Sequence, residues 1–180
     1  MQLENKIAII TGASRGIGFS IAKAFIKQGA KVALLGSRLE SAQKAVSKLL
    51  AEYPDAQLMP FGVDVTNSEE ITKVVSEVVE KWGYIDVLVN NAGVTSAKQI
   101  FDMSDEDFDS VIRINLSGPF KFTREVSKVM KEHGGSIINT SSMVGTYGGR
   151  MQTAYSSSKF GINGLTKSCA KELGPFNIRV

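Results

Sequence analysis

The sequence is poor in residues that form crosslinks or bind metals. Its 180 residues include one cysteine and one histidine, so no disulfide can form within the chain. The cysteine, Cys169, is typical of a residue packed in a helix. The histidine, His133, precedes a pair of glycines and is expected in the last turn of a helix. Since neither has a Cys or His partner nearby in the sequence, we expect no bound metal.

The sequence also lacks long runs of one chemical character. No apolar stretch approaches the roughly 20 residues that span a bilayer, and the N-terminus shows no signal or transit peptide. The net charge is only +3 and the basic residues are dispersed, so we expect neither nucleic acid nor a membrane as a partner. These features predict a cytoplasmic protein. A content of 43% hydrophobic residues suits a single domain over residues 1–180.

What the sequence does contain is an alternation of short β-branched runs with longer helical stretches. Strands are predicted at residues 6–11 and 31–36, within 58–65, and at 85–89 and 136–140, and a sixth begins near 177–180. Helices are predicted at 16–28 and 39–52, from a capping box at 66–69 onward, at 105–133 with a bend near Gly118-Pro119, and at 154–173. The alternation predicts an α/β fold with a doubly wound, Rossmann-like parallel sheet in three α/β/α layers. Its ligand crevice should lie at the carboxyl ends of the strands.

A glycine-rich turn, Thr11–Gly18, joins the first strand to the first helix. Gly12 permits a tight turn, Gly16 lets a pyrophosphate approach the backbone, and Gly18 lets the helix pack on the strand. The N-terminus of the helix would then face the phosphates with unpaired N–H groups. The turn therefore predicts dinucleotide binding, and a tight strand-to-helix connection without a ligand is the alternative.

The end of the second strand bears on which dinucleotide is bound. A free ribose 2′-hydroxyl prefers an acidic partner about twenty residues after the glycine turn. The strand instead ends in Gly36-Ser37-Arg38, and the first carboxylate is Glu40. Arg38, together with Arg15, could hold a 2′-phosphate to which Ser37 donates a hydrogen bond. Either arginine could also be a solvated residue at a helix entrance. We favour NADP(H) over NAD(H).

Polar residues follow the third and fourth strands as well. Asp64 is a plausible partner for an adenine amino group, and its alternative role is a helix cap. Asn90-Asn91-Ala92-Gly93 combines small residues, which allow close approach, with amides that can bond a ribose or pin neighbouring strands.

A tyrosine and a lysine share one face of the last predicted helix. Tyr155 and Lys159 stand at positions i and i+4. An ammonium close to a phenol favours the phenolate, which is how a tyrosine becomes a usable proton donor. An ordinary surface pair is the commoner alternative. The Tyr155–Lys159 pair, however, lies on the helix after the fifth strand, at the sheet edge that carries the glycine turn. This position favours a role in proton donation.

Five motifs in this order resemble the classical short-chain dehydrogenase/reductase (SDR) family. They are TGASRGIG at 11–18, NNAG at 90–93, Asn115 in INLSG, Ser142 in INTSSMVG, and YSSSK at 155–159. The resemblance extends from Lys6 to Val180, and within the family it is greatest to the 3-oxoacyl-ACP reductases and related sugar or polyol dehydrogenases.

The resemblance implies a catalytic tetrad of Asn115, Ser142, Tyr155 and Lys159. Tyr155 would protonate the carbonyl oxygen, Ser142 would orient that oxygen, and Lys159 would bind the nicotinamide ribose and assist Tyr155. Asn115 would hold a water of the proton relay at an irregularity in the long helix. Two residues have simpler alternatives: Ser142 could cap a turn, and Asn115 could satisfy backbone groups.

The resemblance also implies a set of cofactor contacts. They are Gly12, Ser14, Arg15, Gly16, Ile17, Gly18, Ser37, Arg38, Asp64, Val65, Asn91, Ala92, Gly93, Tyr155 and Lys159.

The implied function is NADP(H)-dependent reduction of a carbonyl group to a secondary alcohol. The substrate would be a small molecule or a group bound to an acyl carrier, such as a 3-oxoacyl thioester or a similar ketone. Alternatives are an NAD-preferring sugar, polyol or alcohol dehydrogenase and a non-catalytic nucleotide-binding protein. Family members continue past the sixth strand with a segment that covers the substrate and a last strand, so we expect the chain to be C-terminally truncated.

A homo-oligomer, dimer or tetramer, is a further expectation from the family. Its subunits would pair through the helices at 105–133 and 154–173. Phe120, Phe122, Val126 and Met130 give limited support, because a solvated helix face needs fewer apolar residues and some of these must face the chain's own sheet.

Overall fold

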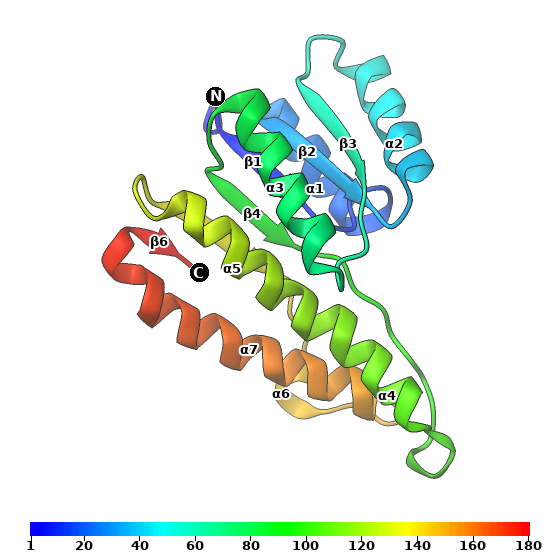
Figure 1. Cartoon of the computed structure of the whole chain (residues 1–180). Helices are drawn as coiled ribbons and strands as arrows, with labels where there is room; N and C mark the ends of the chain where they lie inside the picture. Colours follow the sequence, from blue (N-terminus) through cyan, green and yellow to red (C-terminus); the bar gives the residue numbers. More distant parts are fainter.

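The computed structural model describes residues 1–180 and shows a six-stranded parallel sheet between two layers of helices (Figure 1). The strand order is β3-β2-β1-β4-β5-β6, which is the doubly wound arrangement. The strands are β1 (Ile7–Ile10), β2 (Lys31–Gly36), β3 (Leu58–Gly62), β4 (Val87–Asn90), β5 (Gly135–Asn139) and β6 (Ile178–Arg179). The predicted α/β fold class is confirmed, and strand boundaries differ from the predicted ones by a few residues at most ends.

The helices divide between the two faces of the sheet. One face is covered by α1 (Gly16–Lys27) and α2 (Leu39–Glu52). The other is covered by α3 (Ser68–Trp82), α5 (Gly118–Met130) and α7 (Thr153–Leu173). The last two lie side by side and run in the same direction (Figure 1). No helix is both long and apolar enough to cross a membrane.

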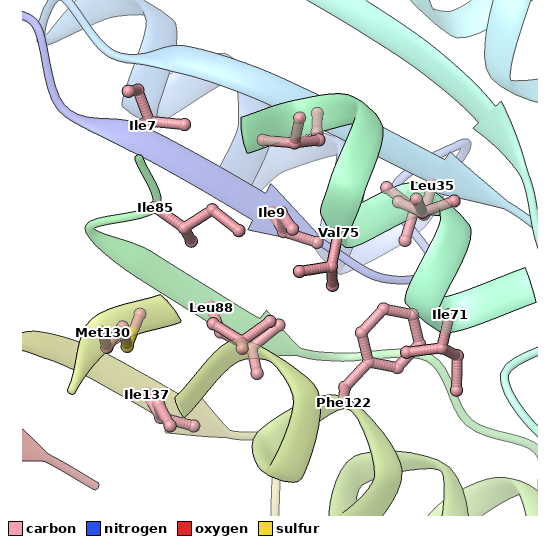
Figure 2. Packing of buried hydrophobic residues seen from close by; sticks show 14 of the residues in the cluster. Ile7, Ile9, Leu35, Ile71, Val75, Ile85, Leu88, Phe122, Met130 and Ile137 are labelled. Carbon is pink, nitrogen blue, oxygen red and sulfur yellow. The ribbon is translucent and has the colours of Figure 1, made fainter. Parts of the chain in front are cut away.

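The larger core lies between the sheet and α3 and α5 (Figure 2). Phe122 of α5 and Ile71 of α3 lie next to each other in this core, which also contains Ile9 and Leu88, and all four side chains are at most 1% exposed. Burial of such side chains stabilises the fold by about 1.5–3 kcal/mol each. Strand β1 is apolar at every position because it is covered on both faces.

The long helix predicted at 105–133 is one rod with a π-helical turn inside it. It consists of α4 (Asp105–Ile112), the π turn Arg113–Ser117, and α5. Pro119 has no N–H to donate to the carbonyl of Asn115 four residues earlier, so the hydrogen-bond ladder shifts register, and Gly118 N donates to Arg113 O. The irregularity therefore lies at Asn115, just before the predicted bend.

Two local predictions were wrong. The capping box at 66–69 does not form, because Thr66 donates its hydroxyl hydrogen to Asp64 at 2.8 Å. The cap of α3 is instead Asn67, whose Oδ1 accepts from the backbone N–H groups of Glu69 and Glu70. The short helix α6 (Val144–Tyr147) lies in a stretch where no helix is predicted.

Candidate active site

The glycine turn is held against the end of β4 by close backbone packing. Gly12 has φ +64°, and a Cβ at this position would lie 2.8 Å from Cα of Ala92. A Cβ on Gly18 would collide with the carbonyl of Gly12 and with the side chain of Asn91. These two glycines therefore fix the turn at the switch point between β1 and β4, where doubly wound sheets bind ligands.

Thr11 and Asn91 tie the same two strand ends together by hydrogen bonds. The buried hydroxyl of Thr11 accepts from the backbone N–H groups of Asn91 and Ala92, each at 3.0 Å. The amide of Asn91 donates to the carbonyls of Thr11 and Gly12 at 3.1 and 3.3 Å. Of the two roles considered for this amide, the structure shows the pinning of neighbouring strands, and only its oxygen is left for a ligand.

The N-terminus of α1 is open and suited to a phosphate group. No side chain caps it, and its first turn contains no acidic residue. Gly16, with φ +58°, has no atom within 4 Å of the position that a Cβ would occupy. Ser14 lies beside this turn, half-buried, and Ile17 is exposed. Unpaired N–H groups at a helix N-terminus favour an anion, so these residues fit a pyrophosphate.

Two arginines without carboxylate partners flank the ends of β1 and β2. Arg15 and Arg38 are both exposed, and neither takes part in an ion pair. Ser37 is exposed beside Arg38. The first carboxylate after β2, Glu40, pairs with Lys44 at 2.6 Å. The guanidinium groups are thus free to bind a phosphate.

Asp64 follows β3 and forms part of a turn. Its Oδ1 accepts from both the N–H and the hydroxyl of Thr66 at 2.8 Å. Asp64 therefore closes a turn before α3 and does not cap that helix, whose N-cap is Asn67, and Oδ2 is left without a partner. Val65 packs on the start of α5: a Cβ on Gly118 would lie 3.1 Å from the carbonyl oxygen of Val65. The loop after β3 thus reaches back toward the switch point.

Asn115 is 1% exposed and joins three segments. Its Oδ1 accepts from Val94 N and its Nδ2 donates to Val94 O, both at 2.8 Å, and Nδ2 also donates to Ser158 Oγ at 3.1 Å. Gly93 lies against this amide: a Cβ on Gly93 would lie 3.2 Å from Asn115 Oδ1. The amide therefore satisfies backbone groups of the loop after β4, rather than groups inside its own helix.

Lys159 and Tyr155 lie on the face of α7 that points toward the end of β5. The Lys159 ammonium is 5.6 Å from the centroid of the Tyr155 ring. Lys159 is 5% exposed, pairs with no carboxylate, and donates to the carbonyl of Thr140 at 2.6 Å. Burial lowers the pKa of Lys159 from its ordinary value of 10.5. An ammonium has three donors, so the buried cation keeps hydrogen-bonding capacity for a ligand.

Ser142 lies between β5 and α6, half-buried. Its hydroxyl accepts a long hydrogen bond of 3.4 Å from Val144 N, which is a weak form of the turn-capping alternative. The helix α6 packs on α7 at Gly145, where a Cβ would lie 2.9 Å from Cβ of Lys159. The turn that carries Ser142 therefore rests on the helix that carries Tyr155 and Lys159.

Comparison with known proteins identifies this arrangement. The family model for short chain dehydrogenases matches residues 6–180. The chain belongs to the short-chain dehydrogenase family. Short-chain dehydrogenases are oxidoreductases that use NAD(P) and act on CH–OH or carbonyl groups, and the N-terminus of α1 and the buried Lys159 fit such a cofactor.

Relatives of this short-chain dehydrogenase differ in the substrates that their names describe. A 3α-hydroxysteroid dehydrogenase of Mediterraneibacter gnavus is 43% identical over 100% of this chain and 72% of its own length. A 3-oxoacyl-ACP reductase of Thermotoga maritima is 44% identical over 100% of this chain and 73% of its own. The crystal structure of an NAD+-bound xylitol dehydrogenase superposes with a TM-score of 0.95 at 34% identity, covering 100% of this chain and 69% of the other.

Sequence reasoning missed several residues that organise the site. Thr11 was predicted as the end of a strand and the start of the glycine turn, with no role for its hydroxyl. Ser158 was not singled out, yet it accepts from Asn115 and donates to the carbonyl of Tyr155 at 2.7 Å. Both are small hydroxyl residues, and the amides that donate to them, on Asn91 and Asn115, lie more than 40 residues away in the sequence. Their strand-end and helix-face positions were visible in the sequence, but their partners were not.

Proposed function

We propose that this short-chain dehydrogenase reduces a ketone to a secondary alcohol with NADPH, and that Tyr155 is the proton donor. The observation that carries the proposal is the buried Lys159 ammonium, which has no carboxylate partner and lies next to the Tyr155 ring. A buried charge without a counter-ion is costly, and such groups cluster at functional sites.

The side chains at the switch point have separable roles in this reaction. Tyr155 donates a proton to the carbonyl oxygen as negative charge develops on it, and Ser142 donates a hydrogen bond to the same oxygen. Lys159 holds a ribose hydroxyl with its remaining donors. Bound NADPH would supply the hydride that reduces the carbonyl carbon. The products are a secondary alcohol and the oxidised nucleotide.

Asn115 would take part in the proton relay through its main-chain carbonyl. Its side-chain donors are both used, on Val94 O and Ser158 Oγ. A water of the proton relay would therefore bind at the Asn115 carbonyl, to which Pro119 cannot donate.

The remaining cofactor contacts follow the strand ends. The α1 N-terminus with Ser14, Gly16 and Ile17 would hold the pyrophosphate, and Asp64 Oδ2 an adenine amino group. Val65 and the Asn91–Gly93 segment would line the nucleoside between them.

We propose NADP(H) over NAD(H) because Arg15 and Arg38, which follow β1 and β2, are exposed and have no carboxylate partners, and such guanidinium groups favour a phosphate ligand. Glu40, the carboxylate that could instead bind a free 2′-hydroxyl, is paired with Lys44. The change Arg38→Asp should therefore weaken NADPH binding by about 10- to 100-fold and leave NADH binding unchanged or improved. Titration of both nucleotides by calorimetry measures this. An NAD-preferring enzyme would show little response of NADPH binding to the change.

The function is tested with ketones of three classes. Acetoacetyl thioesters, 3-ketosteroids and keto sugars, each with NADPH or NADH, are assayed for nucleotide oxidation and for alcohol formed. We expect NADPH-dependent reduction of an acyl thioester or a similarly apolar ketone, because the exposed side chains that follow Ser142, Met143 and Tyr147, are apolar. A protein that binds NADPH and reduces none of the ketones would instead be a nucleotide-binding module.

A further inference from the structure

One face of α7 carries a third polar residue beyond the Tyr155–Lys159 pair. Asn163 follows Lys159 by one helical turn and Tyr155 by two, so the three side chains lie in a row on one side of the helix. The first two are assigned to the reaction. Asn163 has no part in the roles described above.

Asn163 bonds to both ends of the turn that carries Ser142. Ser141 Oγ donates to Asn163 Oδ1 at 2.7 Å, and Asn163 Nδ2 donates to the carbonyl of Gly145 at 2.9 Å. A single amide thus closes the segment Ser141–Gly145 onto the helix, with Ser142 inside it. Both hydrogen bonds are partly buried, which strengthens them relative to bonds in water.

The packing beneath this amide leaves no room for the turn to approach further. A Cβ on Gly145 would lie 2.9 Å from the Cβ, carbonyl carbon and carbonyl oxygen of Lys159. The Ser142 hydroxyl itself has only the 3.4 Å bond from Val144 N. Its position therefore depends on the backbone that Asn163 holds.

We infer that Asn163 is a positioning residue for the proposed reduction: its amide fixes the Ser141–Gly145 turn so that the Ser142 hydroxyl reaches the oxygen that Tyr155 protonates. This inference rests on the proposed function. Displacement of an orienting group by about 1 Å lowers a rate by about 100-fold, so the loss of this amide should lower turnover more than it weakens nucleotide binding.

The kinetic test compares three variants with a matched control. Asn163→Leu removes both bonds with little change in volume. Ser141→Ala removes one of them, together with a weak 3.5 Å bond from Ser141 Oγ to the carbonyl of Lys159, and the double variant combines the two changes. The control, Thr166→Val, breaks the 2.9 Å bond from Asn139 to the next turn of the same helix, away from Ser142. We expect Asn163→Leu to lower kcat by about 10- to 100-fold with KM for NADPH within about twofold. Ser141→Ala should have a smaller effect, and the double variant should be no worse than Asn163→Leu.

A second readout does not depend on activity. The amides of residues 145–148 bond to carbonyls of residues 142–144 within the clamped segment. In the nucleotide-free protein, their hydrogen exchange should be faster in Asn163→Leu than in Thr166→Val, at equal overall stability. Should Asn163→Leu fail to fold, the kinetic and hydrogen-exchange measurements are made on Ser141→Ala instead.

Three kinetic results would overturn the inference. They are an unchanged kcat in Asn163→Leu, an equal loss of kcat in Thr166→Val, and a kcat of the double variant that is lowered by the product of the two single effects. Unchanged exchange at 145–148 would overturn it as well. A wild-type protein that reduces no ketone contradicts the proposed function instead, and the exchange measurement then decides alone whether Asn163 holds the turn.

Discussion

At the scale of single residues, the placement of Lys159 is unfavourable for stability. It is 5% exposed and has a carbonyl, not a carboxylate, as its partner. Removing an ammonium from water is unfavourable unless a counter-charge compensates. The site thus retains a cation at the expense of stability, as functional sites often do.

The change Lys159→Met should therefore stabilise the fold and abolish reduction. We expect the free energy of unfolding to rise by about 1 kcal/mol at neutral pH, which raises Tm by about 2–4 °C. Because burial lowers the pKa of Lys159 below 10.5, the folded state holds this proton less tightly than the unfolded state. The penalty is full below the folded-state pKa and disappears as the pH rises toward 10.5.

Thermal unfolding of both proteins across this pH range measures the effect. The difference in Tm should be largest near neutral pH and should narrow at alkaline pH. A variant that is less stable than wild type at neutral pH, or a difference that does not change with pH, would contradict this reading of Lys159.

The sequence identified the titratable residues of the site but not what their neighbours do. The i, i+4 spacing of Tyr155 and Lys159 is a property of any helix, so their shared face was predictable. The bonds from Lys159 to Thr140 O and from Asn115 to Val94 join segments 19 and 21 residues apart. Such contacts depend on the packed fold, which is why the pinning of the loop by Asn115 was missed, whereas its relay role was implied by the family resemblance.

At the scale of elements, the start of α4 holds the loop that follows β4. Ser104 Oγ accepts from Asp107 N, and the Asp107 carboxylate accepts from Ser104 N, which completes a capping box. The same carboxylate pairs with Lys98 at 2.6 Å, and Lys98 N bonds to Met151 O at 3.0 Å. Hydrogen bonds from Lys98 and Ser104 lower the pKa of Asp107 to about 2. This cap therefore connects the loop after β4 to the segment before α7.

The change Ser104→Ala should destabilise the protein by about 1 kcal/mol, because it removes a helix N-cap. For a chain of this size, Tm should fall by about 2–4 °C. The matched control is Ser110→Ala in the same helix, where alanine is the better helix former and Tm should stay the same or rise. Melting curves followed by circular dichroism measure both. Equal losses in the two variants would contradict the capping role.

Helical periodicity and terminal signals account for most of the elements that were predicted. The bounds of β2 and α2 agree with the prediction, since an apolar run that ends at Gly36 marks β2 and Pro54 follows the end of α2. The helix α6 was missed because Gly145 and Gly148 indicate a turn, and it is stabilised by packing on α7, which only the fold provides. The cap of α3 was misplaced by one residue because Asp64 competes for Thr66.

At the scale of the whole molecule, the apolar residues of α5 divide between the core and the surface. Phe122, Val126 and Met130 are buried in the core, each at most 1% exposed, so they do not support self-association. Phe120 of α5 and Phe160 of α7 are 45% and 50% exposed. Only these two helix positions remain as support for the proposed homo-oligomer.

We expect a dimer or tetramer in solution that pairs through α5 and α7. The double change Phe120→Glu and Phe160→Glu should shift the mass measured by light scattering to that of a monomer, because charge is disfavoured at an interface core. The control is Phe101→Glu, which changes an exposed phenylalanine outside these helices and should leave the mass unchanged. A wild-type monomer would contradict the proposal.

The sheet itself was predictable because short strand-like runs alternate with helical stretches along the chain, and motifs with site residues follow the first five strands. A parallel α/β sheet brings the strand ends to one edge, so the residues of the site could be grouped before the structure was known. The substrate could not be predicted, since its contacts depend on the shapes of loops that carry no such motif.

The central claim, that Tyr155 donates the proton, is tested most directly by Tyr155→Phe. NADPH binding and ketone reduction are measured side by side in the variant and in wild type. We predict an unchanged Kd for NADPH and a loss of at least about 100-fold in kcat, since the phenol is the general acid. Reduction at the wild-type rate by the variant would contradict the mechanism.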